Sequence, residues 1–144
     1  MLKENIMRDM DLAREVLSKT EYSIVVIKNG KILTKRRGVG IRPILEVIDE
    51  LKNSIYGSII GDRTLGKASA LLCRYANAKG VYSPKATKTA IAILIIADIP
   101  SQIDKMVPYI KNRDGDDICP FEEMLKDVDS PDEAYNILKK KILK

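Results

Sequence analysis

The sequence predicts an α/β protein in which an antiparallel hairpin is followed by parallel strands, with helices covering both faces of the sheet. Asn29-Gly30 indicates the hairpin, because both residues tolerate positive φ and lie between two β-rich runs, residues 22–28 and 31–36. After it, short apolar runs alternate with stretches of helical spacing. The length of 144 residues favours a single domain, 1–144, that can bury a real core.

Two helices and one further strand are predicted around the hairpin. Residues 4–19 form an amphipathic helix, since their apolar side chains recur at helical spacing: Ile6, Met10, Ala13, Val16 and Leu17. After the hairpin, Pro43 suits the first turn of a helix with an apolar stripe made by Ile44, Leu45, Val47, Ile48 and Leu51. The stretch YGSIIGD is a short buried strand, and residues 64–78 form the next helix.

The second half of the chain continues the alternation. GVYS predicts a short strand, and Ser83-Pro84 is interpreted as the N-cap and first turn of a helix through KATKTAIAILIIAD, although its β-branched residues also suit a strand. An edge segment follows over residues 103–109. NRDGDD is a loop, and CPFEEMLKDV begins a helix. Ser130 and Glu133 form a capping box that opens a basic C-terminal helix, 130–144.

The chain contains no histidine, and this excludes several kinds of active site. A Ser-His-Asp triad, a Cys-His pair and imidazole metal ligands are all ruled out. Zinc needs three or four Cys, His or carboxylate ligands, and Cys73 and Cys119 are too distant in sequence to start such a set or a disulfide framework. We therefore expect no bound metal and no cofactor.

Apolar and charged patterning favours a cytoplasmic protein that does not enter a membrane. The first residues, MLKENIMRDMD, lack the apolar core of a signal peptide, and the longest apolar run, residues 90–97, is too short to span a bilayer. The net charge of +5 includes the tail KKKILK. Without interleaved aromatic residues, we interpret this charge as a solvated lysine surface rather than a nucleic-acid site. No sequence feature specifies an oligomeric state.

The stretch GDRTLGKA, residues 61–68, is one residue away from a phosphate-binding loop. Gly61, Gly66 and Lys67 have the spacing of G-x-x-x-x-G-K-[ST], but Ala68 stands where a hydroxyl should hold Mg²⁺. Such a loop also belongs after the first strand of its fold, whereas two strands and two helices come before this one. The stretch fits better as a glycine turn that feeds a helix N-terminus, where free N–H groups favour an anion.

We predict a ligand site for a small anionic or nucleotide-like metabolite at Arg42, Asp62, Gly66 and Lys67. Its basis is that two helix starts, at Arg42 and Lys67, are expected to follow neighbouring strands of one parallel sheet. Arg42 would offer a bidentate fork and Lys67 an exposed point charge. The structural alternative stays open: Asp62 caps the helix, and Gly66 lets it pack close to the sheet.

Five stretches resemble a family of small, functionally uncharacterised prokaryotic proteins, domain of unknown function 1893: KNGK, RGVGIRPILE, GDRTLGKASALL, GVYS and VPYIKNRDGDDICPFEE. The resemblance covers residues 20–126 and implies a three-layer α/β/α sandwich of the cytidine deaminase-like fold, with no established activity. Zinc deaminases carry H-x-E and P-C-x-x-C motifs at two helix starts. The matching stretches here, GIRPILE and GDRTLGKA, contain no Cys or His, so the resemblance implies a protein without the zinc site and without zinc-dependent deamination.

Two further functions remain as alternatives, and the residues leave open whether the protein is an enzyme. Cys119 precedes Pro120 at a predicted helix start, which would favour a thiolate nucleophile, although neighbouring carboxylates oppose this and a buried small apolar residue is the simpler interpretation. Asp114, Asp116 and Asp117 are interpreted as solvated turn acids rather than a cation site. The second alternative is an interaction or nucleic-acid-associated module that uses the basic C-terminal helix.

Overall fold

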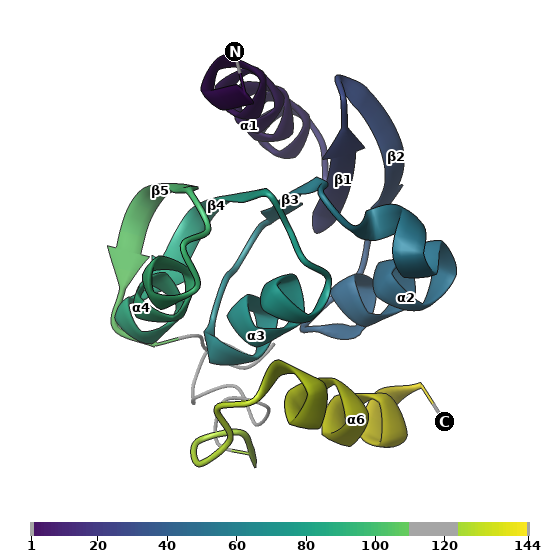
Figure 1. Cartoon of the computed structure of the whole chain (residues 1–144), viewed down its shortest axis with the longest axis vertical. Coiled ribbons are helices and arrows are strands. Elements are labelled where there is room, and N and C mark those ends of the chain that lie inside the picture. The colour runs from purple at the N-terminus through teal and green to yellow at the C-terminus, as the bar shows by residue number, and fades with distance from the viewer. Residues whose placement is uncertain (1, 110–123, 144) are drawn as a thin grey trace.

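The computed structural model describes residues 2–109 and 124–143 of the chain. Its centre is a five-stranded sheet in the order β2-β1-β3-β4-β5 (Figure 1). The strands are β1 (Ile24–Lys28), β2 (Lys31–Arg36), β3 (Ile59–Asp62), β4 (Gly80–Thr87) and β5 (Ser101–Val107). β1 pairs antiparallel with both β2 and β3, whereas β3, β4 and β5 are parallel. The predicted mixed α/β sheet with an N-terminal hairpin is confirmed.

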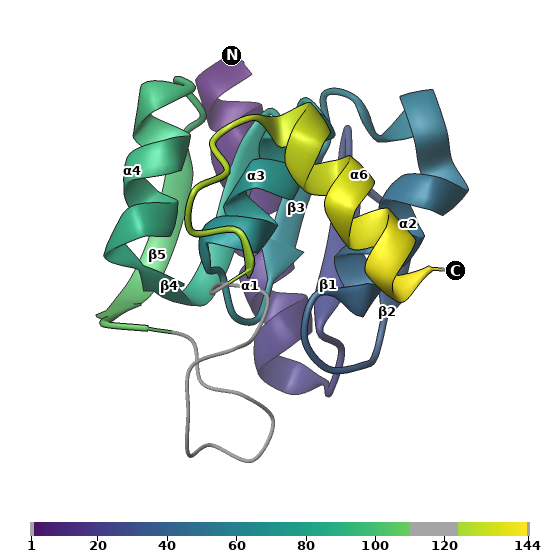
Figure 2. The same cartoon turned by 90° about the horizontal axis from the view of Figure 1, so that it is seen from below.

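Helices cover both faces of this sheet, and each side has its own apolar cluster (Figures 1 and 2). On one face, α1 (Leu2–Lys19) packs Met10, Ala13 and Leu17 against the sheet. The other face carries α2 (Arg42–Leu51) with the 3₁₀ turn η1 (Lys52–Ile55), α3 (Lys67–Tyr75) and α4 (Lys88–Ile96). α6 (Pro131–Ile142) lies outside α3 and α2, away from the sheet. The ring of its Tyr135 stacks on that of Tyr75 with centroids 4.1 Å apart.

Local sequence signals account for most element boundaries. Asn29 and Gly30 have φ of 52° and 81°, as the hairpin turn requires. Pro43 lies in the first turn of α2, where a missing N–H costs nothing. Ser130 Oγ accepts the Glu133 N–H at 3.3 Å and so caps α6.

The helix predicted to begin at Ser83-Pro84 is wrong, because both residues lie inside β4. Proline is tolerated in this central strand where the ladder is interrupted: Ser83 and Lys85 have partners on β5, and Pro84 between them has none. The Ser83 hydroxyl accepts the Lys85 N–H at 3.2 Å and satisfies it locally. α4 starts only at Lys88, with the Thr87 side chain accepting the Ala90 N–H at 3.1 Å.

α3 also begins later than predicted, at Lys67 instead of residue 64. Leu65 is held extended beside β4, since its N–H donates to the Lys85 carbonyl at 2.8 Å and its carbonyl accepts the Thr87 N–H at 3.0 Å. The sheet therefore continues past β3 before the helix starts. In residues 2–109 and 124–143, no helix is both long enough and apolar enough to cross a membrane.

Candidate functional site

The candidate site lies where β3 ends and α3 begins. β3 terminates at Asp62, and Gly66 occupies the N-cap of α3 with no side-chain cap hydrogen bond. The expectation that Asp62 caps this helix is therefore wrong. The first backbone N–H groups of a helix have no partner within the helix, so the start of α3 favours negative charge.

Asp62 is a buried carboxyl group, with 7% of the residue exposed. The Ser69 side chain and the Thr64 backbone N–H both hydrogen-bond to it. Burial nevertheless dominates and raises the pKa of Asp62 from its ordinary value near 3.8 to about 7. Cys73, one turn beyond Ser69, is fully buried, and burial together with the nearby Asp62 charge raises the pKa of its thiol. The sequence did not predict the hydrogen bond between the side chains of Ser69 and Asp62.

Lys67, the first residue of α3, is largely buried rather than exposed as expected, because only 11% of its side chain is accessible. Its Nζ donates to the Lys126 carbonyl at 3.0 Å and lies 3.4 Å from Asp129 Oδ1. Asp129 is 94% exposed, so this ion pair is well solvated and contributes little. The ammonium is thus held at the start of α3 by the segment that leads into α6.

Arg42 begins α2 on the same face of the sheet, but its side chain is held elsewhere. Its Nη2 donates to the Ile142 carbonyl at 2.7 Å, and its Nη1 lies 3.5 Å from Glu46 Oε2. Arg42 thus contacts the last residue of α6, whereas Lys67 contacts the segment that precedes the first residue of α6. Because α6 has 12 residues and is about 18 Å long, the two cations do not meet at one point.

The sheet order explains this separation. α2 follows β2 and α3 follows β3, and β1 lies between those strands. The expectation that the two helix starts follow neighbouring strands of a parallel sheet is therefore wrong. Both strands run in the same direction, so the two helices still start at the same edge of the sheet, after strands that lie about two strand spacings or 10 Å apart.

Gly61 does not belong to a phosphate-binding loop. It lies within β3, paired with Val25 of β1 and Tyr82 of β4, so its backbone belongs to the sheet. A Cβ atom on Gly61 would lie 2.9 Å from Val25 Cγ1 and 3.0 Å from Ala13 Cβ, on the face covered by α1. Close packing of α1 accounts for this glycine.

Other candidate residues from the sequence fall outside the described part of the chain. Cys119 and the acids Asp114, Asp116 and Asp117 lie in the segment 110–123, so the nucleophile hypothesis remains a prediction. Within residues 2–109 and 124–143, no group of three or more Cys, Asp or Glu side chains is placed to hold a metal ion.

Two polar clusters carry contacts that sequence patterns did not reveal. Arg63 donates to the carbonyls of Leu17, Thr20 and Tyr22, with its shortest contact at 2.6 Å, and so ties the end of α1 to β3. On the same face, Asp104 of β5 accepts hydrogen bonds from Arg14 Nη2 and Tyr82 Oη, both at 2.5 Å. Their sequence separation of up to 90 residues hides this cluster from local patterns.

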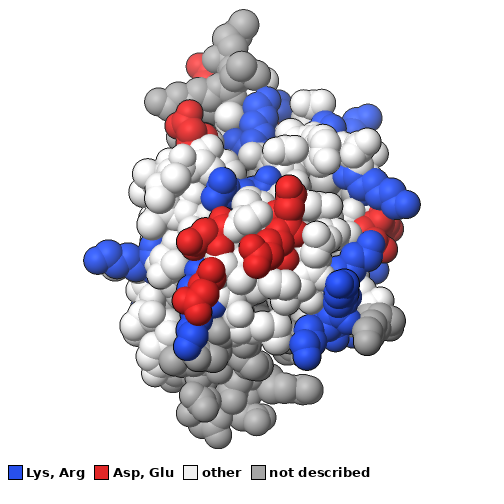
Figure 3. All heavy atoms as spheres, turned by 60° about the horizontal axis from the view of Figure 1, so that its bottom comes forward, with Lys and Arg blue, Asp and Glu red and all other residues white. Residues whose placement is uncertain are grey.

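The face that carries α6 has both signs of charge (Figure 3). Asp132 and Glu133 lie in the first turn of α6, and Lys139, Lys140 and Lys141 lie in its last turn. This distribution complements the helix dipole. Lys139 is further paired with Asp49 of α2 at 3.3 Å. Lys139, one of the three lysines in the last turn of α6, is therefore placed beside an acid.

Fold and site together define a small α/β/α sandwich with a mixed five-stranded sheet. The family described as "Domain of unknown function (DUF1893)" matches residues 12–142, and the chain belongs to this family. The crystal structure of a DUF1893 family protein (TM1506) from Thermotoga maritima is similar in fold, with a TM-score of 0.83 and 20% identity over 93% of this chain and 90% of that one. Acinetobacter baumannii RibD, form 2, aligns with a TM-score of 0.45 and 15% identity over 72% of this chain, which spans 36% of the RibD chain. No curated protein matches.

Proposed function

We propose that this DUF1893 protein binds a small anionic metabolite at the start of α3, with Lys67 as its cation. The observation that carries the proposal is a lysine side chain only 11% exposed at the first residue of a helix whose N-cap is a glycine without a side-chain cap. A positive side chain and the positive end of a helix dipole then act on the same small region.

The surroundings of Lys67 allow a ligand to take over its contacts. Its partners include a backbone carbonyl, that of Lys126, and a solvated carboxylate, that of Asp129. Phosphate or carboxylate oxygens would make stronger, charge-assisted hydrogen bonds to the same ammonium. Asp62 lies buried behind the loop, and because its pKa is raised to about 7, it is mostly protonated below that pH and adds little repulsion toward an anion there.

The spacing of the cations sets the size of ligand that uses both. Inorganic phosphate at the start of α3 would contact Lys67, and Arg42 would keep its hydrogen bond to the Ile142 carbonyl of α6. A nucleotide-like molecule is long enough to reach from α3 toward the start of α2, where Arg42 is 55% exposed and can leave the Ile142 carbonyl. Arg42 therefore contributes only to binding of the longer ligand.

The experiment is a thermal-shift titration with inorganic phosphate, nucleoside monophosphates and a dicarboxylate, because a ligand of the folded state raises its apparent stability. Lys67→Met removes the charge and keeps the aliphatic stem. We expect this substitution to reduce the binding free energy of the anion by about 1.5–3 kcal/mol, the range for a hydrogen bond to a charged group. Arg42→Gln should weaken binding of nucleotides and leave that of phosphate unchanged.

Lys88→Met is the matched control, since Lys88 is also the first residue of a helix and its N-terminus is capped by Thr87. It should bind every anion like the wild type. The proposal is wrong if no anion stabilises the wild-type protein, or if Lys67→Met and Lys88→Met respond alike while both remain folded.

A further inference from the structure

The outer edge of β5 is bordered by exposed apolar side chains on both sides. β5 ends the described sheet, and no described strand pairs with its outer edge. Ile95 and Ile96 of α4 are 68% and 79% exposed on one face, and Met7 of α1 is 54% exposed on the other. Met106 of β5 is 60% exposed. An unpaired edge with apolar flanks is a site where another strand can add.

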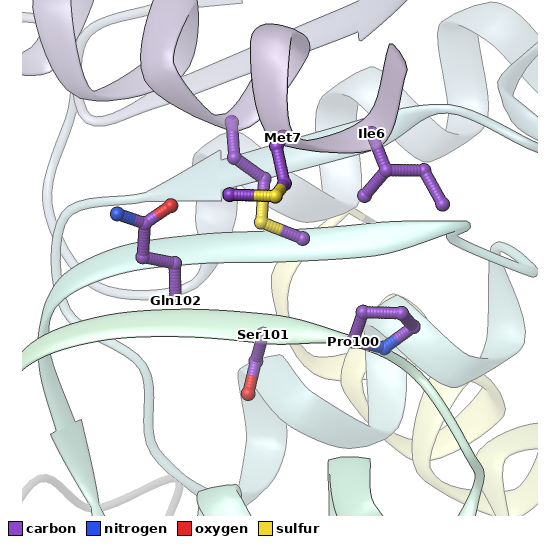
Figure 4. A pocket seen from close by; sticks show the side chains of 6 residues that line it. Ile6, Met7, Pro100, Ser101 and Gln102 are labelled. Atoms are coloured by element: carbon purple, nitrogen blue, oxygen red, sulfur yellow. The ribbon is translucent and has the colours of Figure 1, made fainter. Parts of the chain in front are cut away.

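Beside this edge, α1 and β5 form an apolar groove of about 460 Å³ (Figure 4). It is lined by Ile6, Met7, Met10, Pro100, Ser101 and Gln102. In Figure 4, Gln102 points toward α1 and Ser101 points the other way, as the two-residue period of a strand requires. Met106, four residues beyond Gln102, therefore shares the face of the groove.

α4 is apolar on nearly all sides, which is typical of a helix that is covered. Ala90 and Leu94 pack into the core. Ala92, Ile95 and Ile96 are exposed at helical spacing on the outer side. α4 itself packs on β4 and β5, the last two strands at this edge of the sheet.

The backbone of β5 offers hydrogen-bonding groups at this edge. The Val81 N–H donates to the Pro100 carbonyl at 3.0 Å, and Val81 is in register with Ser101. In a parallel ladder this pattern turns Pro100 and Gln102 toward β4 and leaves the N–H and C=O groups of Ser101 and Ile103 facing outward.

We propose that a second copy of this chain covers this surface, with the two β5 strands paired antiparallel about Ile103. In this register Gln102 lies opposite Asp104 of the other copy, and Ser101 lies opposite Lys105, so no like charges face each other. The neighbouring registers, centred on Asp104 or Lys105, place two carboxylates or two ammonium groups opposite one another. Like-charge repulsion therefore excludes these two registers and permits the pairing about Ile103.

The same register places apolar groups together on both faces. Pro100 lies opposite Met106 of the other copy, so the exposed Met106 enters the groove beside α1. On the other face, the two α4 helices run antiparallel across the two-fold axis, and their outer stripes meet. Ile95, Ile96, Met7 and Met106 expose on the order of 400–500 Å² of apolar surface, about half of the roughly 800 Å² that each partner of a stable complex buries.

The first test is the molecular mass in solution, measured by sedimentation over a range of protein concentrations. The wild-type protein should sediment with twice the 16.1 kDa of one chain. Ile96→Lys and Met106→Lys should each raise the dissociation constant at least tenfold, and Val39→Lys, at a 62% exposed position after β2, should leave it unchanged. Circular dichroism and melting establish that each variant is folded. A monomeric wild type, or a dimer weakened equally by Val39→Lys, would overturn the proposal.

The second test uses disulfides to fix the register, in a Cys119→Ser background. Mixed Ser101→Cys and Lys105→Cys chains should cross-link under mild oxidation, because opposite residues in an antiparallel pair have Cα atoms about 5.5 Å apart, within disulfide reach. Neither variant alone should cross-link, because the two introduced cysteines of such a dimer lie four residues apart along the paired strands. Cross-linking of Ser101→Cys alone, or no cross-linking of the mixture, would contradict the pairing.

Discussion

Gly61 of β3 and Ala13 of α1 lie so close that a Cβ atom on Gly61 would be 3.0 Å from the Cβ atom of Ala13. Val25 Cγ1 would be nearer still, at 2.9 Å. This contact sets the distance between α1 and the sheet, and it explains a glycine that the sequence pattern alone presents as part of a phosphate-binding loop.

Gly61→Ala should destabilise the protein by about 1–3 kcal/mol, the usual cost of overpacking a core. Chemical denaturation measures the change in the free energy of unfolding. Ala13→Gly in the same chain removes the facing methyl group, and the double variant should recover part of the loss relative to the sum of the two single variants. Simple additivity of the two losses would show that Gly61 does not act through α1.

Asp62→Asn should make the protein more stable above pH 7 and should flatten the pH dependence of its stability. Unfolded Asp62 titrates near 3.8 and folded Asp62 near 7, so between these values only the folded state holds the proton. Stability contributed by this group therefore falls as pH rises from about 4 to 7, by up to about 4 kcal/mol. Urea denaturation of both proteins from pH 4 to 8 gives the difference. Parallel curves across that range would mean that Asp62 ionises normally.

Arg63→Met should destabilise the protein by about 2–4 kcal/mol, because one guanidinium group satisfies the carbonyls of Leu17, Thr20 and Tyr22. Hydrogen exchange should rise at the C-terminal turn of α1 before it rises elsewhere. Arg36→Met is the control: its partner Glu50 is 49% exposed, and the loss should stay below about 1 kcal/mol. Equal losses in the two variants would contradict the role given to Arg63.

Thr87→Val should cost about 1 kcal/mol, the typical value of an N-cap, because Thr87 Oγ1 accepts the Ala90 N–H at the start of α4. Thermal melting of the variant measures it. The substitution keeps the side-chain volume, so packing changes little. If instead Thr87→Val left the melting temperature unchanged, the cap would not contribute to the stability of α4.

The sequence alone was sufficient for the elements that local interactions decide. The Asn29-Gly30 turn, Pro43 in α2 and the Ser130 cap of α6 each depend on residues within a few positions of one another. Alternating apolar runs then led to the correct mixed sheet with helices on both faces. The helix start predicted at Ser83-Pro84 is wrong because the local sequence is typical of a helix N-terminus, whereas pairing of β4 with β3 and β5 holds this segment extended.

Tertiary structure decided what the candidate site contains. Sequence spacing put Arg42 and Lys67 at similar helix starts, but β1 inserts between β2 and β3, and α6 then holds the two cations at its opposite ends. Asp62 was visible as a polar residue after a strand, yet only burial beneath α3 moves its pKa toward 7. The contacts that hold Arg42 and Lys67 join residues 100 and 59 positions apart in the chain, which no local pattern encodes.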